Sequence, residues 1–248
     1  MVARRVGTEH REAPVNALAA RLPAELAARS VLLRLVAENA WLPALLALFG
    51  TAVAALLERK FAPFGAADRA LSGAGLGVAL PLLAYALLDA GLGNQRLRRC
   101  LEPIARHGGD VRAAGAGALA AFCVVLAFAG ALLAAVAVLA ARSMGDPMLG
   151  RDLAASVWIG ALAGAAYAGW FALGSTFGQR GGGRKWVLAL DFVLGATSGV
   201  LALPWPRAHV RNLLGGAPPF DLGQGAASLG LLAMTALTML VALGRTTR

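Results

Sequence analysis

The sequence predicts an all-α integral membrane protein with six transmembrane helices, and three observations predict it. Hydrophobic residues make up 58% of the 248 residues, charged residues only 15%, and the mean hydropathy is +0.68. A soluble domain is usually about half apolar and about a quarter charged. The apolar residues fall into six runs, each near the length of about 20 residues that a helix needs to cross a bilayer. Basic residues are concentrated in alternate connections between those runs.

The six runs define one predicted transmembrane domain over residues 40–244. They are Ala40–Leu57, Gly73–Leu92, Ala116–Ala141, Leu153–Gly174, Val187–Trp205 and Ala226–Leu243. Small residues recur four positions apart in these runs, as at Gly73/Gly77 and Gly160/Gly164. Such pairs let helix backbones approach closely in lipid, so they predict a packed bundle.

Two shorter regions precede the first run. Residues 1–22 form a basic tail, which we expect in the cytoplasm. Residues 23–39 (Pro23–Asn39) predict an amphipathic helix along the cytoplasmic interface, since Glu25/Arg29 and Arg34/Glu38 are i,i+4 pairs. Its apolar side is formed by Leu22, Leu26, Leu32, Leu33 and Val36. The alternative is a simple extension of the first spanning helix.

The distribution of Lys and Arg predicts the orientation. The N-terminal segment, the second and fourth connections and the C-terminal tail (residues 245–248) hold 16 of these residues, against 7 in the other connections. Cytoplasmic segments carry the excess of Lys and Arg, so both termini are predicted in the cytoplasm. This topology accounts for the net charge of +10 without nucleic acid. Heavy use of Ala, Leu, Gly and Arg favours a multi-pass protein of the bacterial cytoplasmic membrane.

The run Gly178–Lys185, GQRGGGRK, resembles a phosphate-binding P-loop only in its glycine spacing. Arg184 stands where that motif has its lysine, and Trp186 replaces the hydroxyl residue. The motif also follows a strand, whereas a membrane helix is predicted here. We therefore expect no nucleotide site in this chain.

No group of residues predicts an enzyme or a metal centre. The three histidines, His10, His107 and His209, fall in the tail, a cytoplasmic connection and an external connection. The two cysteines have no metal-ligand spacing. The chain by itself is therefore predicted to be neither an enzyme nor a holder of a metal or cofactor.

Two carboxylates lie at the predicted cytoplasmic ends of spans, Asp89 and Asp191. An intramembrane carboxylate raises a functional hypothesis by default. The structural interpretation is a helix-end carboxylate paired with a nearby arginine or a backbone donor, and it is favoured here.

The strongest local stretches are EPIARHG, Glu102–Gly108, and GSTFGQRGGGRKW, Gly174–Trp186. They lie in the two cytoplasmic connections of a six-span layout that starts with an interfacial helix. A Pro- and Gly-rich external segment precedes the last span. From about Leu22 to Leu243 this layout resembles the permease subunit of an ABC-2 type ABC transporter, with the type V exporter fold.

The resemblance implies partners and their contact residues. A separate ATP-binding cassette subunit would hold ATP and Mg, and a second permease copy or a paralogue would complete the path through the lipid. Trp205–Leu222 matches the position of the re-entrant helices of that family. The residues implied to contact the ATPase are Leu101, Glu102, Pro103, Ile104, Ala105, Arg106, His107, Gln179, Arg180, Arg184 and Lys185.

The function expected from this resemblance is that of an ATP-driven export permease. Two alternatives stay open: a membrane assembly or anchoring subunit that transports nothing, and an ion-coupled carrier. An intramembrane enzyme is weakened by the lack of a catalytic group, and a carrier by the lack of charge near mid-membrane. The spans hold few polar residues, which favours a lipid-like or amphipathic substrate.

Overall fold

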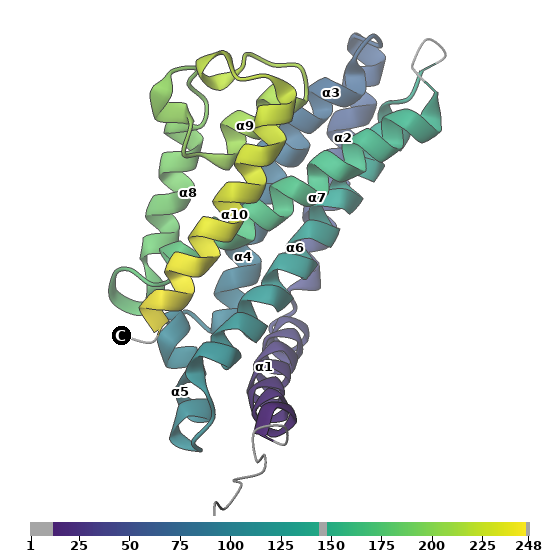
Figure 1. Ribbon diagram of the computed structural model, residues 1–248. Helices are drawn as coiled ribbons and strands as arrows, with labels where there is room; N and C mark the ends of the chain where they lie inside the picture. The colour runs from purple at the N-terminus through teal and green to yellow at the C-terminus, as the bar shows by residue number, and fades with distance from the viewer. Residues whose placement is uncertain (1–11, 144–147, 247–248) are drawn as a thin grey trace, which may run out of the picture.

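The computed structural model describes residues 12–143 and 148–246, with side chains from residue 21 onwards. These residues form helices joined by turns and loops, and none of them forms a strand (Figure 1). Five helical segments are long and apolar enough to cross a membrane, and they are Trp41–Phe61, Ala66–Arg106, Val111–Ala141, Leu149–Gly174 and Gln224–Thr246. The chain is therefore a multi-pass membrane protein by length and composition, and the predicted count of six spans is not confirmed.

The elements follow one another with short connections. The α-helices are α1 Glu12–Ala37, α2 Trp41–Phe61, α3 Ala66–Ala70, α4 Leu80–Leu92, α5 Leu97–Arg106, α6 Val111–Ala141, α7 Leu149–Gly174, α8 Gly183–Leu194, α9 Pro206–Leu213 and α10 Gln224–Thr246. A π-helix, η1 Leu71–Ala79, joins α3 to α4. Three short 3₁₀ turns, η2 Gln179–Gly181, η3 Val200–Ala202 and η4 Pro219–Asp221, lie in the connections.

The predicted helix over Val187–Trp205 is wrong in its second half. Its helix, α8, ends at Leu194 after 12 residues, about 18 Å at the rise of an α-helix. That is shorter than the hydrocarbon core of about 30 Å. Thr197 caps the end by donating its hydroxyl to the carbonyl of Leu194 (2.7 Å), and Pro204 and Pro206 follow. The chain then turns back through η3 and α9, so the apolar run is a broken segment.

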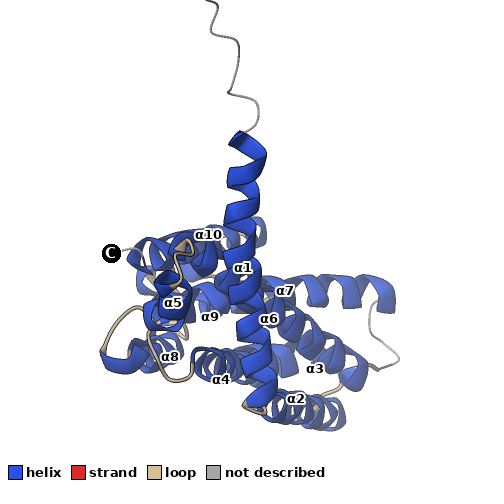
Figure 2. Cartoon of the chain, turned by 90° about the horizontal axis from the view of Figure 1, so that it is seen from below, coloured by secondary structure: helices blue, strands red, loops and turns tan. Residues whose placement is uncertain are grey.

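Helix α1 lies across one end of the bundle. It is seen nearly end-on in Figure 1 and along its length in Figure 2. It starts at Glu12, earlier than predicted, so part of the expected tail is helical. Residues 1–11 of that tail lie outside the described residues. The buried side of α1 is Ala27, Val31 and Leu35, which packs on α6, while all five predicted apolar residues are exposed.

Helices α6 and α7 are held together by direct backbone contact. A Cβ placed on Gly164 would overlap the carbonyl of Leu126, and one on Gly130 would overlap the carbonyl of Gly160. The predicted close-packing pair Gly160/Gly164 is thus confirmed at the α6–α7 interface. Gly73 is different, since nothing lies within 4 Å of a Cβ placed there.

The two ends of the bundle differ in the elements they carry. The base, as we call it, bears α5, the α7–α8 connection and the C-terminal end of α10 (Figure 1). The opposite end bears α3 and the broken segment Gly195–Gly223 with α9 (Figure 1). The two stretches that carried the family resemblance therefore meet at the base.

Candidate functional site

The base is built around α5, whose sequence LRRCLEPIAR separates apolar from charged residues. Leu97 and Leu101, one helical turn apart, are buried against the bundle, whereas Arg98, Arg99 and Glu102 are exposed. The helix ends at Arg106 with His107 as its C-cap, and Gly108 adopts a positive φ of 77° that suits glycine. The buried leucines therefore attach α5 to the helix bundle, and its charged side remains exposed.

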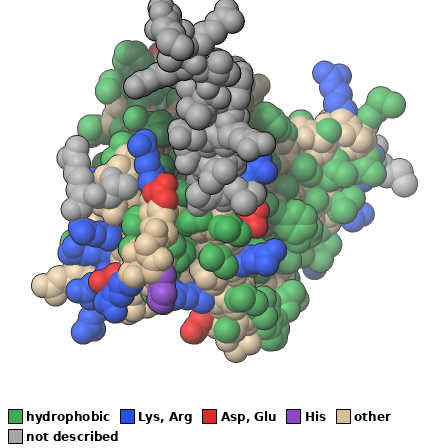
Figure 3. Space-filling view, turned by 60° about the horizontal axis from the view of Figure 1, so that its bottom comes forward, with side chains coloured by type: hydrophobic (Ala, Val, Ile, Leu, Met, Phe, Trp, Pro, Cys, Tyr) green, Lys and Arg blue, Asp and Glu red, His purple; other side chains and the backbone are tan. Residues whose placement is uncertain are grey.

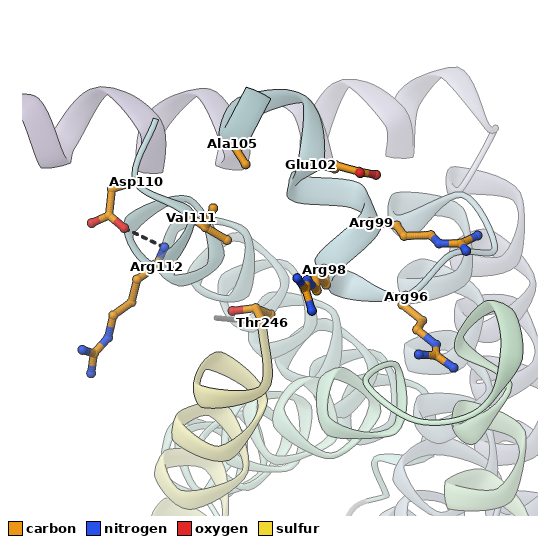
Figure 4. A pocket seen from close by; sticks show the side chains of 9 residues that line it. All are labelled: Arg96, Arg98, Arg99, Glu102, Ala105, Asp110, Val111, Arg112 and Thr246. Atoms are coloured by element: carbon orange, nitrogen blue, oxygen red, sulfur yellow. Dashed lines mark hydrogen bonds between the residues drawn. The ribbon is translucent and has the colours of Figure 1, made fainter. Parts of the chain in front are cut away.

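A hollow of about 640 Å³ opens between α5 and the ends of α6 and α10 (Figure 4). Its lining residues are Arg96, Arg98, Arg99, Glu102, Ala105, Asp110, Val111, Arg112 and Thr246. Asp110 is occupied in capping α6, because its carboxylate accepts from the backbone N–H of Arg112 (2.8 Å). Glu102 accepts from Arg106 (3.2 Å). Four arginines thus line a hollow whose two carboxylates are already engaged.

The α7–α8 connection extends this basic surface. A second hollow, of about 270 Å³, is lined by Arg96, Arg99, Gln179 and Arg180. Arg96 links the two connections by donating Nε–H to the carbonyl of Gly178 (2.6 Å). Figure 3, which brings the base forward, shows Lys and Arg side chains gathered beside a larger apolar area. Segments about 80 residues apart in the chain therefore form one basic surface.

Arg184 does not belong to that surface. It is only 1% exposed and is the largest fully buried side chain among the residues that the structure describes. Its guanidinium donates to Asp89 Oδ1 (2.8 Å) and to the carbonyl of Leu88 (3.2 Å). A buried arginine needs such partners, and these hold α8 against the end of α4. Of the residues predicted to contact the ATPase, Arg184 and Leu101 are therefore buried and offer no exposed surface to a partner in this structure.

The other predicted contact residues do lie within reach at the base. Arg106, His107, Gln179, Arg180 and Lys185 are exposed. The set that remains accessible is completed by Glu102 and Pro103, with Ile104 and Ala105 half-buried. Whether a partner binds them stays a prediction.

Asp89 and Asp191 occupy different environments. Asp89 has the arginine partner that its helix-end position predicts, in Arg184. Asp191 is buried inside the bundle, where it accepts from the hydroxyl of Tyr167 (2.9 Å) and from the backbone N–H of Arg207 (3.4 Å). The sequence did not single out Tyr167 or Arg207, because they lie 24 residues before and 16 residues after Asp191.

The side chains that the base exposes are mainly arginines. Among the described residues, no three His, Cys, Asp or Glu side chains come together to hold a metal ion. The GQRGGGRK run follows a membrane helix, α7, and contains one 3₁₀ turn, in contrast to the strand-led phosphate loop. Exposed arginines on a firmly anchored helix suit recognition of acidic groups.

Comparison with protein families, with curated proteins and with solved structures finds no match to this chain.

Proposed function

We propose that the chain is the membrane-spanning permease subunit of an ATP-driven exporter. A second permease copy or a paralogue would complete the path, and a separate ATP-binding cassette subunit with ATP and Mg would bind the base. The base would then face the cytoplasm, with both termini on that side, in the bacterial cytoplasmic membrane. The chain itself would catalyse no reaction.

The observation that carries the proposal is how α5 is attached. Its leucines are buried in the bundle while its arginines are exposed, so the helix is attached by its apolar side and presents a charged side to the outside. Arg96 ties its start to the α7–α8 connection, and Arg184 ties α8 to α4. A push on α5 or on Gln179–Gly182 would therefore reach helices in both halves of the chain.

The experiment isolates the full chain from its native membranes in mild detergent and identifies what accompanies it by mass spectrometry. We expect a soluble P-loop ATPase, and the complex should hydrolyse ATP. The test variant is Arg98→Gln/Arg99→Gln, which leaves the buried leucines of α5 intact. Its matched control is Arg59→Gln/Lys60→Gln, an adjacent exposed basic pair in α2, toward the opposite end.

Under the proposal the α5 variant retains about a fifth or less of the partner, since interfacial charges guide and register association. The α2 control should retain all of it. A chain that purifies without any nucleotide-binding partner would contradict the proposal and favour an anchoring subunit.

One observation supports an ion-coupled carrier as the second candidate. Asp191 is a buried carboxylate within the bundle, where ionisable residues often serve ion pathways. Reconstituted vesicles separate the two functions: a carrier would respond to a proton gradient without ATP, and Asp191→Asn would abolish that response. The export permease would need its ATPase and ATP.

A further inference from the structure

An apolar groove runs along the seam between α2 and the η1–α4 helix. Its volume is about 740 Å³, within the usual range of ligand sites of about 300–1,000 Å³. Eleven of its twelve lining residues are apolar or glycine: Pro43, Leu46, Ala47, Gly50, Gly73, Ala74, Val78, Ala79, Leu82, Leu83 and Ala86. From Gly73 to Ala86 it follows the helix for about 20 Å at the rise of an α-helix.

The groove exists because α2 packs loosely on its neighbours. Along its 21 residues only Thr51 and Ala55 are buried. Gly50 on α2 and Gly73 on η1 both face open space, with nothing within 4 Å of a Cβ placed on either. Leu46 and Leu82 are exposed, so the groove opens to the outside of the bundle, where the acyl chains of the membrane lie.

The twelfth lining residue is Arg207, at the start of α9. Its guanidinium lies 4.5 Å from the ring centroid of Phe192. Its Nη1 is buried and has no hydrogen-bond partner in the part of the chain that the structure describes. The nearby Asp191 attracts the guanidinium electrostatically, but its carboxylate accepts from Tyr167 and from the backbone N–H of Arg207. No ion pair within 4 Å joins Asp191 to the guanidinium among the described residues. A permanent positive charge at an apolar site is costly without an anion.

We propose that this groove binds an anionic phospholipid. One acyl chain lies along α2 and α4, and the phosphate accepts hydrogen bonds from Arg207. The charged group is then at the α9 end of the groove, and the chain points towards the base. Charge and shape select the ligand together, because an anionic headgroup brings a net negative charge to the guanidinium, which a neutral or zwitterionic lipid does not.

This site is independent of the proposed export function, since it lies within one chain and involves no residue of the base. It is tested on the isolated full chain in bilayer discs of phosphatidylcholine. The probe is phosphatidylglycerol with a photoactivatable group on one acyl chain, present at a few per cent. Labelled peptides are mapped by mass spectrometry, and the matched probe is phosphatidylcholine with the same chain.

With phosphatidylglycerol we expect label concentrated on residues 43–50 and 73–86. Arg207→Gln should lower it about tenfold, the loss of one charge-assisted contact. Its control is Arg151→Gln, an exposed arginine at the start of α7. Gly50→Phe should also remove the label by filling the groove, since nothing lies within 4 Å of a Cβ placed at Gly50. Gly150→Phe, where a Cβ meets the same open space, should not remove it.

Three results would overturn the proposal: equal labelling by the two probes, label spread evenly over the outward faces of α6 and α10, or no difference between Arg207→Gln and Arg151→Gln. A groove that stays unlabelled while two copies cross-link through α2 would also overturn it, by assigning the groove to a second chain. Gly50→Phe keeps Arg207. A loss of label in this variant therefore cannot result from misfolding caused by removal of the arginine.

Discussion

Arg180 lies in the α7–α8 connection and Arg184, four residues later, lies in the first turn of α8, yet the two belong to different regions of the molecule. Arg180 is exposed on the basic surface of the base. Arg184 is buried and bonded to Asp89 and Leu88. The exposed arginines of the base can meet another molecule, whereas the buried arginine holds α8 and α4 together. Charge alone therefore does not identify a recognition site, and burial separates recognition from structure.

The largest expected difference in stability is between variants of Arg184 and variants of Arg180. We expect Arg184→Ala to lower the free energy of unfolding by about 2–3 kcal/mol, because it empties a buried site and leaves the carbonyl of Leu88 without its donor. Asp89 contributes less to this loss, since its side chain is 38% exposed and can bind water. Arg180→Ala should change it by no more than about 0.5 kcal/mol, as for other surface positions. Thermal unfolding of the purified protein in detergent, followed by tryptophan fluorescence, measures both. Equal stability of the two variants would mean that Arg184 is not structurally required.

The second test addresses the other buried polar pair. Tyr167→Phe should cost about 1–2 kcal/mol, because it removes the hydroxyl donor of a buried carboxylate and little else. Tyr85→Phe is the matched control, since it lies against the same ring, Phe171, and shows no hydroxyl hydrogen bond among the described residues. A Tyr167 variant as stable as the Tyr85 variant would show that Asp191 finds another donor.

A third variant tests how firmly the base is built. Asp110→Ala removes the N-cap of α6 and should cost about 1 kcal/mol. Asp110→Asn, which keeps an acceptor oxygen, should recover most of that stability. Hydrogen exchange at the first turn of α6 reports the effect locally, and unchanged protection in the alanine variant would contradict the capping role.

The smallest change in stability is expected for the exposed arginines of α5. Arg98→Gln/Arg99→Gln should leave the free energy of unfolding within about 0.5 kcal/mol of the original. The same unfolding assay measures it. A larger loss would show that these arginines stabilise the fold, and would weaken their proposed role in recognition.

Hydropathy could predict five spans, because about 20 apolar residues in a row have few stable alternatives in lipid. It could not predict where α8 ends, since Val187–Trp205 is apolar on both sides of the turn at Gly195. The Gly160/Gly164 spacing predicted a close contact because glycine is needed where backbones touch. The burial of Arg184 and the Tyr167–Asp191 bond follow from how α7 and α8 are placed in space, which no local pattern encodes.

The Arg184–Asp89 pair also constrains the order in which the protein's contacts can form during synthesis. Its two residues are 95 positions apart in the chain, and chains emerge from the ribosome N-terminus first. Helix α4 is synthesised before α6 and α7, whose glycine contacts are local and need no later segment. The ion pair of Asp89 with Arg184 therefore cannot form until α8 has been synthesised. A nascent chain stopped before α8 would have a complete α6–α7 hairpin and an unfinished base.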